Sequence, residues 1–204
     1  MNAPTSFSQR ALTYEATLHN VYDLAASARS AVFFDMEGTL VEDVPYNVDP
    51  ALLRFSSGAI RALRLLDEVG LPLVVVTNQP GLASGRFTRE AFARLQHALT
   101  EQIRREAGVT LTGFYACPHV PGPDGAPACS RRKPAPGLLR QAALAHRFDL
   151  SRSWMIGDIP DDIEAGQRAG CRTVLLDVGN ETQCVSRNSG RRITGARICS
   201  RQLN

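Results

Sequence analysis

The stretch AVFFDMEGTL, residues 31–40, places four apolar residues directly before an aspartate and a glycine-bearing loop. A short, continuously apolar run that ends in this way predicts a buried β-strand over 31–35. Its last residue is Asp35, whose carboxylate is then expected where the strand leaves the sheet. Because ligands of open α/β sheets bind at the carboxyl ends of the strands, this stretch indicates both a fold class and the position of a site.

Strands and helices alternate in the sequence after this stretch. Apolar segments predict further strands at 71–78, within 111–119, at 153–158 and at 172–178. N-cap residues, helical periodicity and closing glycines predict helices over 49–70, 88–108, 137–148 and 161–170. This alternation is typical of βαβ units, so we expect one α/β domain with a parallel sheet covered by helices. No inserted block is large enough for a separate cap domain.

The composition fits a folded domain, with 204 residues of which 44% are hydrophobic and 21% charged. No run approaches the roughly 18 apolar residues that a membrane span needs, and residues 1–20 lack the pattern of a secretory signal. A cytoplasmic location is therefore the default expectation, with no membrane partner. The five cysteines are odd in number and unevenly spaced, so we expect reduced thiols.

Charge and pattern divide the chain into three parts. Residues 1–30 carry no strong pattern beyond a weak helix at 11–28 and are interpreted as an N-terminal extension. The α/β domain is expected over 31–180, followed by a basic C-terminal tail over 181–204. Beyond Glu181 the tail contains five arginines and no acidic residue. We expect a solvated terminus, and a contact with nucleic acid or an acidic partner is the less favoured alternative.

Polar residues stand at four of the predicted strand ends, where they are expected to converge on one site: Asp35, Thr77 with Asn78, Cys117 with His119, and Asp158. Asp35 can attack phosphorus as a carboxylate, and Glu37 can serve as general acid and base. Asp35 and Asp158 together can hold Mg²⁺, which prefers oxygen ligands. Thr77 offers a hydroxyl donor and Lys133 a positive charge for phosphoryl oxygens. The pattern indicates hydrolysis of a phosphomonoester.

Four ordered motifs resemble those of the haloacid dehalogenase (HAD) superfamily and cover most of the chain. They are FFDMEGTL (33–40), VVVTNQ (74–79), RRKP (131–134) and IGDIPDD (156–162). The resemblance implies a Rossmann-like domain with the sheet order 3-2-1-4-5, an aspartyl-phosphate intermediate on Asp35, and Mg²⁺ held by Asp35, the backbone carbonyl of Glu37 and Asp158. It also implies that Asp162 supports the lysine or the metal shell.

Three further segments narrow the resemblance to a capless subgroup of these phosphatases. TNQPGLASGRFT (77–88), YACPH (115–119) and CSRRKP (129–134) resemble the heptose-bisphosphate and histidinol-phosphate phosphatases. A small sugar or alcohol phosphate is the implied substrate. Thr77, Asn78 and Lys133 are the expected phosphate or substrate contacts, with Arg132 on a second anionic group. The subgroup usually carries a structural zinc, of pattern Cys-x-His…Cys-x-Cys.

Glu37 departs from the family pattern, which has a second aspartate at this position. Glutamate adds one methylene and about 1.5 Å of reach. Two readings follow: an enzyme with a slower or adjusted acid–base step, or a degenerate module that binds phosphate without turnover. A polynucleotide-end phosphatase that uses the basic tail is a further alternative. The sequence does not indicate an oligomeric state.

Two loops also depart from the subgroup. Cys117, His119 and Cys129 occupy three zinc positions, but Arg131 stands where the fourth cysteine would be. Structural zinc sites are nearly always four-coordinate, so zinc is possible but disfavoured unless water, Cys171 or Cys184 completes the site. Ser84 replaces an arginine that would grip the distal end of the substrate, and Arg86 is the candidate replacement.

Overall fold

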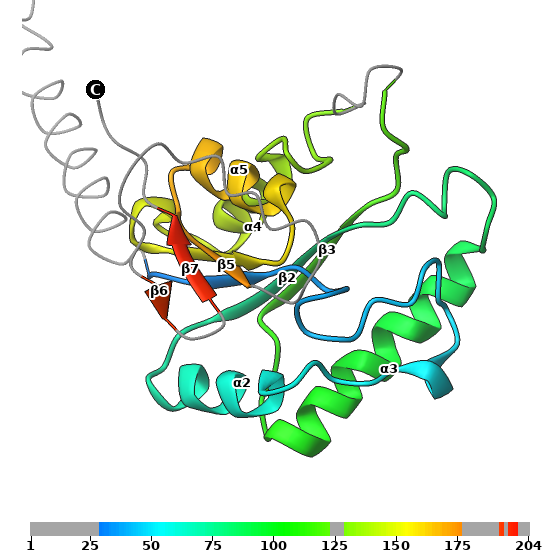
Figure 1. The fold of residues 1–204 in the computed structure, drawn as a ribbon, viewed down its shortest axis with the longest axis horizontal. Coiled ribbons are helices and arrows are strands. Elements are labelled where there is room, and N and C mark those ends of the chain that lie inside the picture. Colours follow the sequence, from blue (N-terminus) through cyan, green and yellow to red (C-terminus); the bar gives the residue numbers. More distant parts are fainter. Residues whose placement is uncertain (1–28, 123–128, 177–191, 194–195, 200–204) are drawn as a thin grey trace, which may run out of the picture.

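The computed structural model describes residues 29–122, 129–176, 192–193 and 196–199, in which strands and helices alternate (Figure 1). The strands are β1 (Val32–Phe34), β2 (Leu73–Asn78), β3 (Gly113–Cys117), β4 (Trp154–Gly157), β5 (Arg172–Leu176), β6 (Arg192–Ile193) and β7 (Ala196–Cys199). The helices are α2 (Ala59–Glu68), α3 (Arg89–Ala107), α4 (Gly137–His146) and α5 (Pro160–Ala169), with short 3-10 helices η1 (Pro50–Leu52) and η2 (Leu150–Arg152).

The strands form one sheet in the order β3-β2-β1-β4-β5-β7-β6. The first five are parallel, which confirms the predicted fold class and the predicted order 3-2-1-4-5. β1 lies in the middle, and Phe34 pairs with Val75 of β2 and with Ile156 of β4. Asp35 therefore leaves the sheet between the ends of β2 and β4, where residues from several strands can meet.

The sheet continues past the boundary expected at residue 180. β7 pairs antiparallel with β5, and β6 pairs antiparallel with β7. These strands contain the β-branched residues Ile193 and Ile198 and flank a Thr-Gly dipeptide in the sequence, a pattern that fits a hairpin. The arginine-rich composition of the tail concealed this signal. The rest of the tail and residues 1–28, including the helix predicted at 11–28, lie outside the described residues.

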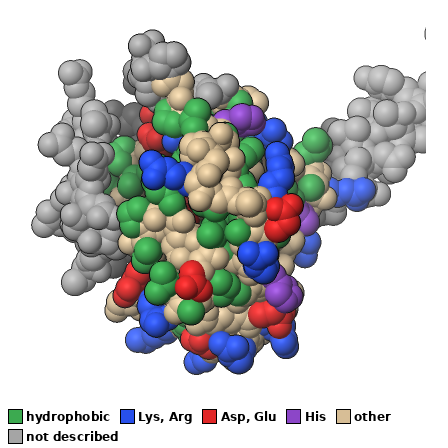
Figure 2. Space-filling model, turned by 90° about the vertical axis from the view of Figure 1, so that its right-hand side faces the viewer, with side chains coloured by type: hydrophobic (Ala, Val, Ile, Leu, Met, Phe, Trp, Pro, Cys, Tyr) green, Lys and Arg blue, Asp and Glu red, His purple; other side chains and the backbone are tan. Residues whose placement is uncertain are grey.

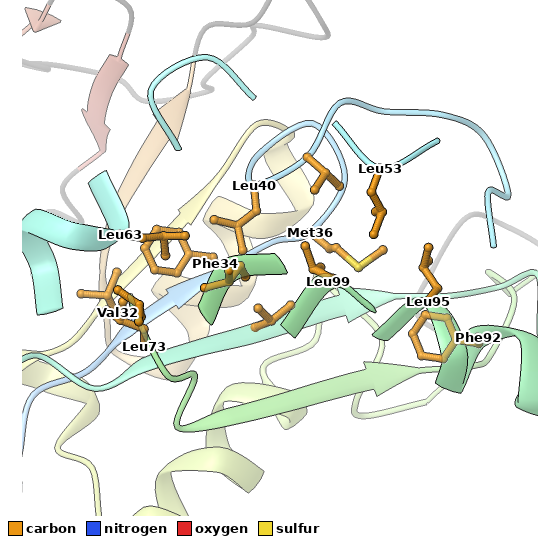
Figure 3. Packing of buried hydrophobic residues seen from close by; sticks show 14 of the residues in the cluster. Val32, Phe34, Met36, Leu40, Leu53, Leu63, Leu73, Phe92, Leu95 and Leu99 are labelled. Carbon is orange, nitrogen blue, oxygen red and sulfur yellow. The ribbon is translucent and has the colours of Figure 1, made fainter. Parts of the chain in front are cut away.

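Helices cover both faces of the parallel strands, α2 and α3 on one side and α4 and α5 on the other (Figure 1). The side chains of β1 alternate between the two layers, as a strand buried on both faces requires. Val32 and Phe34 join the core under α2 and α3, which Figure 3 shows, whereas Phe33 joins the core under α4 and α5. No helix of the described part is both long and apolar enough to cross a membrane.

The helix boundaries follow local capping. Thr88 accepts a hydrogen bond from the Ala91 N–H and begins α3, and Gly108 ends it with a φ of 75°, as predicted. The prediction of a helix that starts at Asp49 is wrong. Asp49 caps only η1, and α2 begins ten residues later, after Gly58 with a φ of 82°. A left-handed glycine interrupts helical hydrogen bonding, so the two segments cannot form one helix.

Candidate active site

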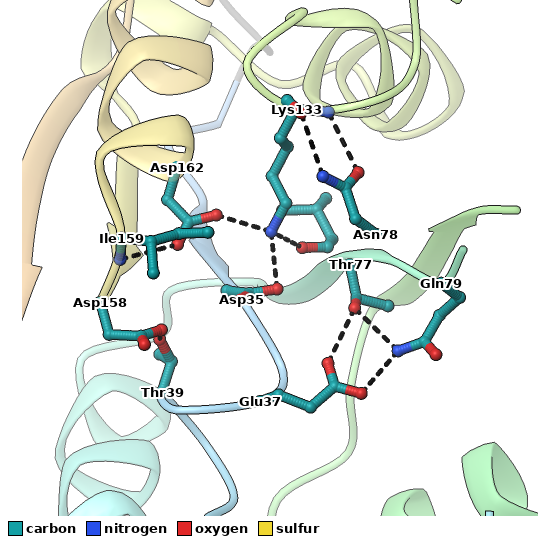
Figure 4. Close-up of polar contacts among 11 residues, drawn as sticks. Asp35, Glu37, Thr39, Thr77, Asn78, Gln79, Lys133, Asp158, Ile159 and Asp162 are labelled. Carbon is teal, nitrogen blue, oxygen red and sulfur yellow. Dashed lines mark hydrogen bonds and ion pairs between the residues drawn. The ribbon is translucent and has the colours of Figure 1, made fainter. Parts of the chain in front are cut away.

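The predicted site residues from four separate segments gather at the carboxyl edge of the sheet (Figure 4). A cavity of about 620 Å³ opens there, lined among others by Asp35, Glu37, Asn78, Lys133 and Asp158. Asp35, Lys133 and Asp158 are each less than 10% exposed. The structure therefore brings the charged groups of the first, third and fourth motifs together as buried side chains in one pocket.

Lys133 is the centre of the charge network. Its Nζ lies 2.6 Å from Asp35 Oδ1 and 2.7 Å from Asp162 Oδ1, and it donates to the Val76 carbonyl oxygen at 2.9 Å. Burial alone would lower the pKa of Lys133, but Asp162 and Asp35 outweigh burial and raise it. The lysine is therefore charged and held in one position between two aspartates.

Asn78 fixes the backbone of the lysine. Its side-chain Nδ2 donates to the Lys133 carbonyl oxygen, and its Oδ1 accepts from the Lys133 N–H, both at 3.0 Å. The end of β2 thereby holds the loop that carries Lys133. The contact between Asn78 and substrate remains a prediction, and the structure adds this supporting contact, which the sequence did not indicate.

Burial, opposed by the charge of Lys133 and assisted by that of Asp162, raises the pKa of Asp35 to about 7. Burial also raises the pKa of Asp162. Asp35, Asp158 and Asp162 form a cluster of three carboxyl groups, two of which share the single charge of Lys133. A bound cation would relieve the excess negative charge and favour the ionised carboxylates.

The donor set fits Mg²⁺. Carboxylate oxygens of Asp35, Asp158 and Asp162 lie within 4.8 Å of one another, and oxygen is the ligand that Mg²⁺ prefers. Asp158 is oriented by Thr39, whose hydroxyl donates to Asp158 Oδ1 at 2.9 Å. Gly38, with a φ of 74°, packs so closely that a Cβ there would overlap the Asp158 carboxyl. Asp35 and Asp158 line the cavity, whereas Asp162 is fully buried and is not among its lining residues, so Asp35 and Asp158 are the better placed ligands.

Glu37 forms a second network beside the first. Thr77 Oγ1 donates to Glu37 Oε2 at 3.1 Å, and Gln79 Nε2 donates to Glu37 Oε1 at 2.6 Å. Burial, followed by the charge of Asp35, raises the pKa of Glu37 to about 7. A carboxyl group that titrates near neutrality can both give and take a proton, as general acid–base catalysis requires. The predicted phosphate donor Thr77 thus contacts the predicted acid–base residue.

The sequence reasoning missed Gln79. A usable signal was present, because side chains alternate along a strand and residues two apart point the same way. Gln79 follows Thr77 by two positions at the end of β2, so both side chains reach the same side of the pocket, and Asn78 between them reaches Lys133.

Arg132 and Tyr46 also line the cavity, and Arg86 contacts Tyr46. Arg132 is only partly exposed, and its Nη1 donates to the His119 carbonyl oxygen at 2.9 Å. Tyr46 also lines the cavity, and the Arg86 guanidinium carbon lies 4.8 Å from the centre of the Tyr46 ring. Ser84 is exposed and its hydroxyl donates to the Pro80 carbonyl oxygen. Arg86 therefore contacts Tyr46, a residue that lines the cavity.

Cys117, His119 and Cys129 meet outside this cavity. The two Sγ atoms are 3.5 Å apart, and His119 Nδ1 lies 3.5 Å from Cys117 Sγ and 3.2 Å from Cys129 Sγ. Within the described ranges the group has three members and Arg131 is exposed. Cys171 is buried in the core and does not join them, and Cys184 lies outside the described residues. Zinc binding remains a prediction with three candidate ligands.

Sequence comparisons find related phosphatases. Residues 130–196 match a family model described as HAD-hydrolase-like. The D-glycero-β-D-manno-heptose-1,7-bisphosphate 7-phosphatase of Yersinia pestis is 40% identical over 151 residues, which cover 72% of this chain and 79% of that protein. The protein of the same name from Escherichia coli K12 is 36% identical over 154 residues, covering 74% and 80%.

Structure comparisons agree with them. A crystal structure of a HAD-like phosphatase from Mesorhizobium loti has a TM-score of 0.68 and 34% identity, covering 83% of this chain and 78% of that one. The D,D-heptose 1,7-bisphosphate phosphatase of B. bronchiseptica, complexed with magnesium and phosphate, has a TM-score of 0.63 and 29% identity, covering 71% and 78%. Sequence and fold thus point to the same group of proteins.

Proposed function

The chain belongs to the HAD-like phosphatases, which are phosphoric monoester hydrolases, and from this premise we propose that it removes phosphate from a small sugar phosphate in a Mg²⁺-dependent reaction. One observation carries the proposal: Asp35, Lys133 and Asp158 arrive from different segments and meet in one buried pocket. The cavity of about 620 Å³ has room for more than a phosphate group.

In the first step, a carboxylate oxygen of Asp35 attacks phosphorus, and the bond between phosphorus and the leaving oxygen breaks. Glu37 gives its proton to that oxygen, so the product leaves as an alcohol. Lys133 binds a phosphoryl oxygen with its ammonium group, which stays in place because Asp162 holds it from the other side at 2.7 Å. The product of this step is a phosphorylated Asp35.

In the second step, water attacks the phosphorylated Asp35. Glu37, now ionised, takes a proton from the water, and the bond between phosphorus and the Asp35 oxygen breaks to release phosphate. The Asp35 and Asp158 carboxylates and the Glu37 carbonyl would hold Mg²⁺. When bound, this ion supplies positive charge to the phosphoryl oxygens. The pKa of about 7 for Glu37 supports its use as an acid in one step and a base in the next.

The rest of the substrate would occupy the outer cavity. Arg132 lines it and can bind a second anionic group, which fits a sugar bisphosphate such as those that name the relatives. A polynucleotide end is less well supported. On the face drawn in Figure 2, basic side chains lie scattered among acidic ones, whereas a bound backbone needs a continuous basic surface.

A phosphate-release screen tests the proposal. Sugar monophosphates, sugar bisphosphates, histidinol phosphate and nucleotides would be supplied with Mg²⁺ or with a chelator. We expect release from a sugar phosphate, dependent on Mg²⁺, and a loss of about 10³-fold or more in Asp35→Asn. Asp67→Asn, on the exposed surface of α2, is the control and should match the parent protein. Equal rates for Asp35→Asn and the parent protein would exclude the mechanism.

A degenerate phosphate-binding module is the alternative that Glu37 raises. Beryllofluoride, which mimics a phosphoryl group on aspartate, separates the two readings. Binding of Mg²⁺ and beryllofluoride without phosphate release from any compound in the screen would favour the module over the enzyme.

A further inference from the structure

Gln79 has no part in the mechanism above, although it is 4% exposed and contacts the acid–base residue directly. We propose that Gln79 is a positioning residue, which holds the longer Glu37 side chain where its carboxyl reaches the leaving oxygen and the attacking water. The proposal rests on the function proposed above and goes beyond it. It assigns a partner to the residue at which this chain departs from the family pattern.

The backbone of Gln79 is itself fixed. Its N–H donates to the Cys117 carbonyl oxygen at 2.7 Å, directly after the pair formed by Asn78 and Cys117 in the β2–β3 register. Its carbonyl oxygen accepts from the Leu82 N–H at 3.2 Å. The amide of Gln79 therefore projects from a point that the sheet holds in place, which is what a positioning residue needs.

The contacts of Gln79 close a triangle. Its Nε2 lies 2.6 Å from Glu37 Oε1 and 3.1 Å from Thr77 Oγ1, and Thr77 Oγ1 lies 3.1 Å from Glu37 Oε2. Both carboxylate oxygens of Glu37 are thus held by different residues of β2 and its end (Figure 4). Two donors on two oxygens fix the plane of the carboxyl group as well as its position.

A glutamate needs this support more than an aspartate does. Its additional methylene adds a rotatable bond, so an unsupported carboxyl would be distributed over several rotamers. Misplacement by about 1 Å can cost about 10²-fold in rate. An aspartate at position 37 would end about 1.5 Å short of the present carboxyl, beyond hydrogen-bond reach of the Gln79 amide.

An amide also suits both steps of the reaction. When Glu37 is ionised, the amide nitrogen donates to it, as seen here. When Glu37 is protonated, rotation of the amide would present its oxygen as an acceptor for the carboxyl hydrogen. A single residue can therefore hold Glu37 both before and after it transfers its proton.

The first test is Gln79→Ala, measured with the fastest substrate of the phosphate-release screen. We expect kcat to fall about 10- to 100-fold, with KM and the affinity for beryllofluoride changed by less than about threefold, since Gln79 is not assigned a contact with substrate. Gln102→Ala is the matched control. It removes another amide-to-carboxylate bond, from Gln102 Nε2 to Glu106 Oε1 at 2.9 Å on α3, and should leave kcat unchanged.

The second test is a double-mutant cycle with Glu37→Asp. If Gln79 acts through the longer carboxyl, Gln79→Ala should cost less than about threefold when it is added to Glu37→Asp. An equal loss in both backgrounds would overturn the proposal, as would a loss confined to KM. If Glu37→Asp has no measurable turnover, the division between kcat and KM in Gln79→Ala decides alone. A parent protein that releases no phosphate would overturn the proposed function. A parent protein that is active and has the same kcat as Gln79→Ala would overturn only this inference.

Discussion

The carboxylate pocket and the cysteine–histidine group are both sets of three potential metal ligands, yet they are built in different ways. Asp35, Asp158 and Asp162 are all buried, and Lys133 provides a partner charge inside the set. In the other set, Cys117 is buried and His119 and Cys129 are partly exposed. The fourth position expected from the motif is Arg131, whose side chain is exposed.

The difference shows what secures a group of ligands. Two strand ends and one helix start fix the carboxylates, so their geometry follows from the sheet and from packing. Cys129, by contrast, belongs to the loop between β3 and α4. This chain has Arg131 in place of the expected fourth ligand, and the sheet forms without that ligand. We therefore expect the carboxylate pocket to control stability and activity, and the cysteine–histidine group to tolerate change.

The largest effect on stability should come from Lys133→Met. It leaves the buried carboxyl groups of Asp35 and Asp162 without their cation, and removal of one member of a buried pair typically costs about 3–5 kcal/mol. Urea unfolding without added metal would measure the loss. Arg104→Met is the control, since it removes the exposed pair with Glu101, whose atoms are 2.8 Å apart, and should change little. Similar losses in the two variants would contradict the assigned importance of the pocket.

The second prediction concerns pH. Asp35 and Glu37 have ordinary pKa values of 3.8 and 4.5, which folding raises to about 7. Between these values the folded protein binds more protons than the unfolded chain, so stability should fall as pH rises from about 4 to about 7. Without Mg²⁺ we expect a loss on the order of several kcal/mol over this range, because both groups keep their protons through most of it in the folded protein.

Urea unfolding at several pH values would measure this dependence. Saturating Mg²⁺ should reduce the decline at the upper end, because the cation stabilises the ionised carboxylates, and Glu37→Gln should remove its share without metal. A metal-free protein whose stability rises steadily from pH 4 to pH 7, by contrast, would show that these two groups do not dominate.

The smallest effect on activity is expected at the cysteine–histidine group. Arg131→Cys would add a third thiol and thereby a fourth ligand beside His119, and tetrahedral zinc sites prefer four protein ligands. We expect the variant to retain zinc through chelator treatment that strips the parent protein, with little change in kcat. Elemental analysis after dialysis against chelator would measure this. Retention of one zinc per chain by both proteins would show that the parent site is already complete.

The sequence predicted the parallel part of the fold well because its signals are local. Short, continuously apolar runs such as AVFF and LVVV indicate buried strands, whereas the order of the five strands came from the resemblance to the HAD superfamily. The antiparallel pair of β6 and β7 was not predicted, because its strands are short and the C-terminal segment that contains them is rich in arginine. The helix predicted to start at Asp49 was wrong for another local reason. Asp49-Pro50 is a valid start for a helix of any length, and here it begins only the short η1.

The site was predictable as a set of residue types, but most of its pairings were not. The resemblance implied that Asp162 supports the lysine or the metal shell, and in the structure 2.7 Å separates Asp162 Oδ1 from Lys133 Nζ. Contacts such as those of Gln79 and Asn78 depend on the register of β2 and on where a distant loop returns, and neither is written in the local sequence. The functional roles assigned to these residues stay predictions until the variants are measured.

The paired bonds between the Asn78 amide and the Lys133 backbone have a consequence for how this protein can diversify. These bonds fix the position of Lys133 relative to β2, so this position depends little on the conformation of the segment from Cys117 to Lys133. Insertions, deletions or a lost ligand in that segment can then accumulate without displacing the ammonium group. Substitutions in that segment can then change contacts with substrate at small cost to catalysis.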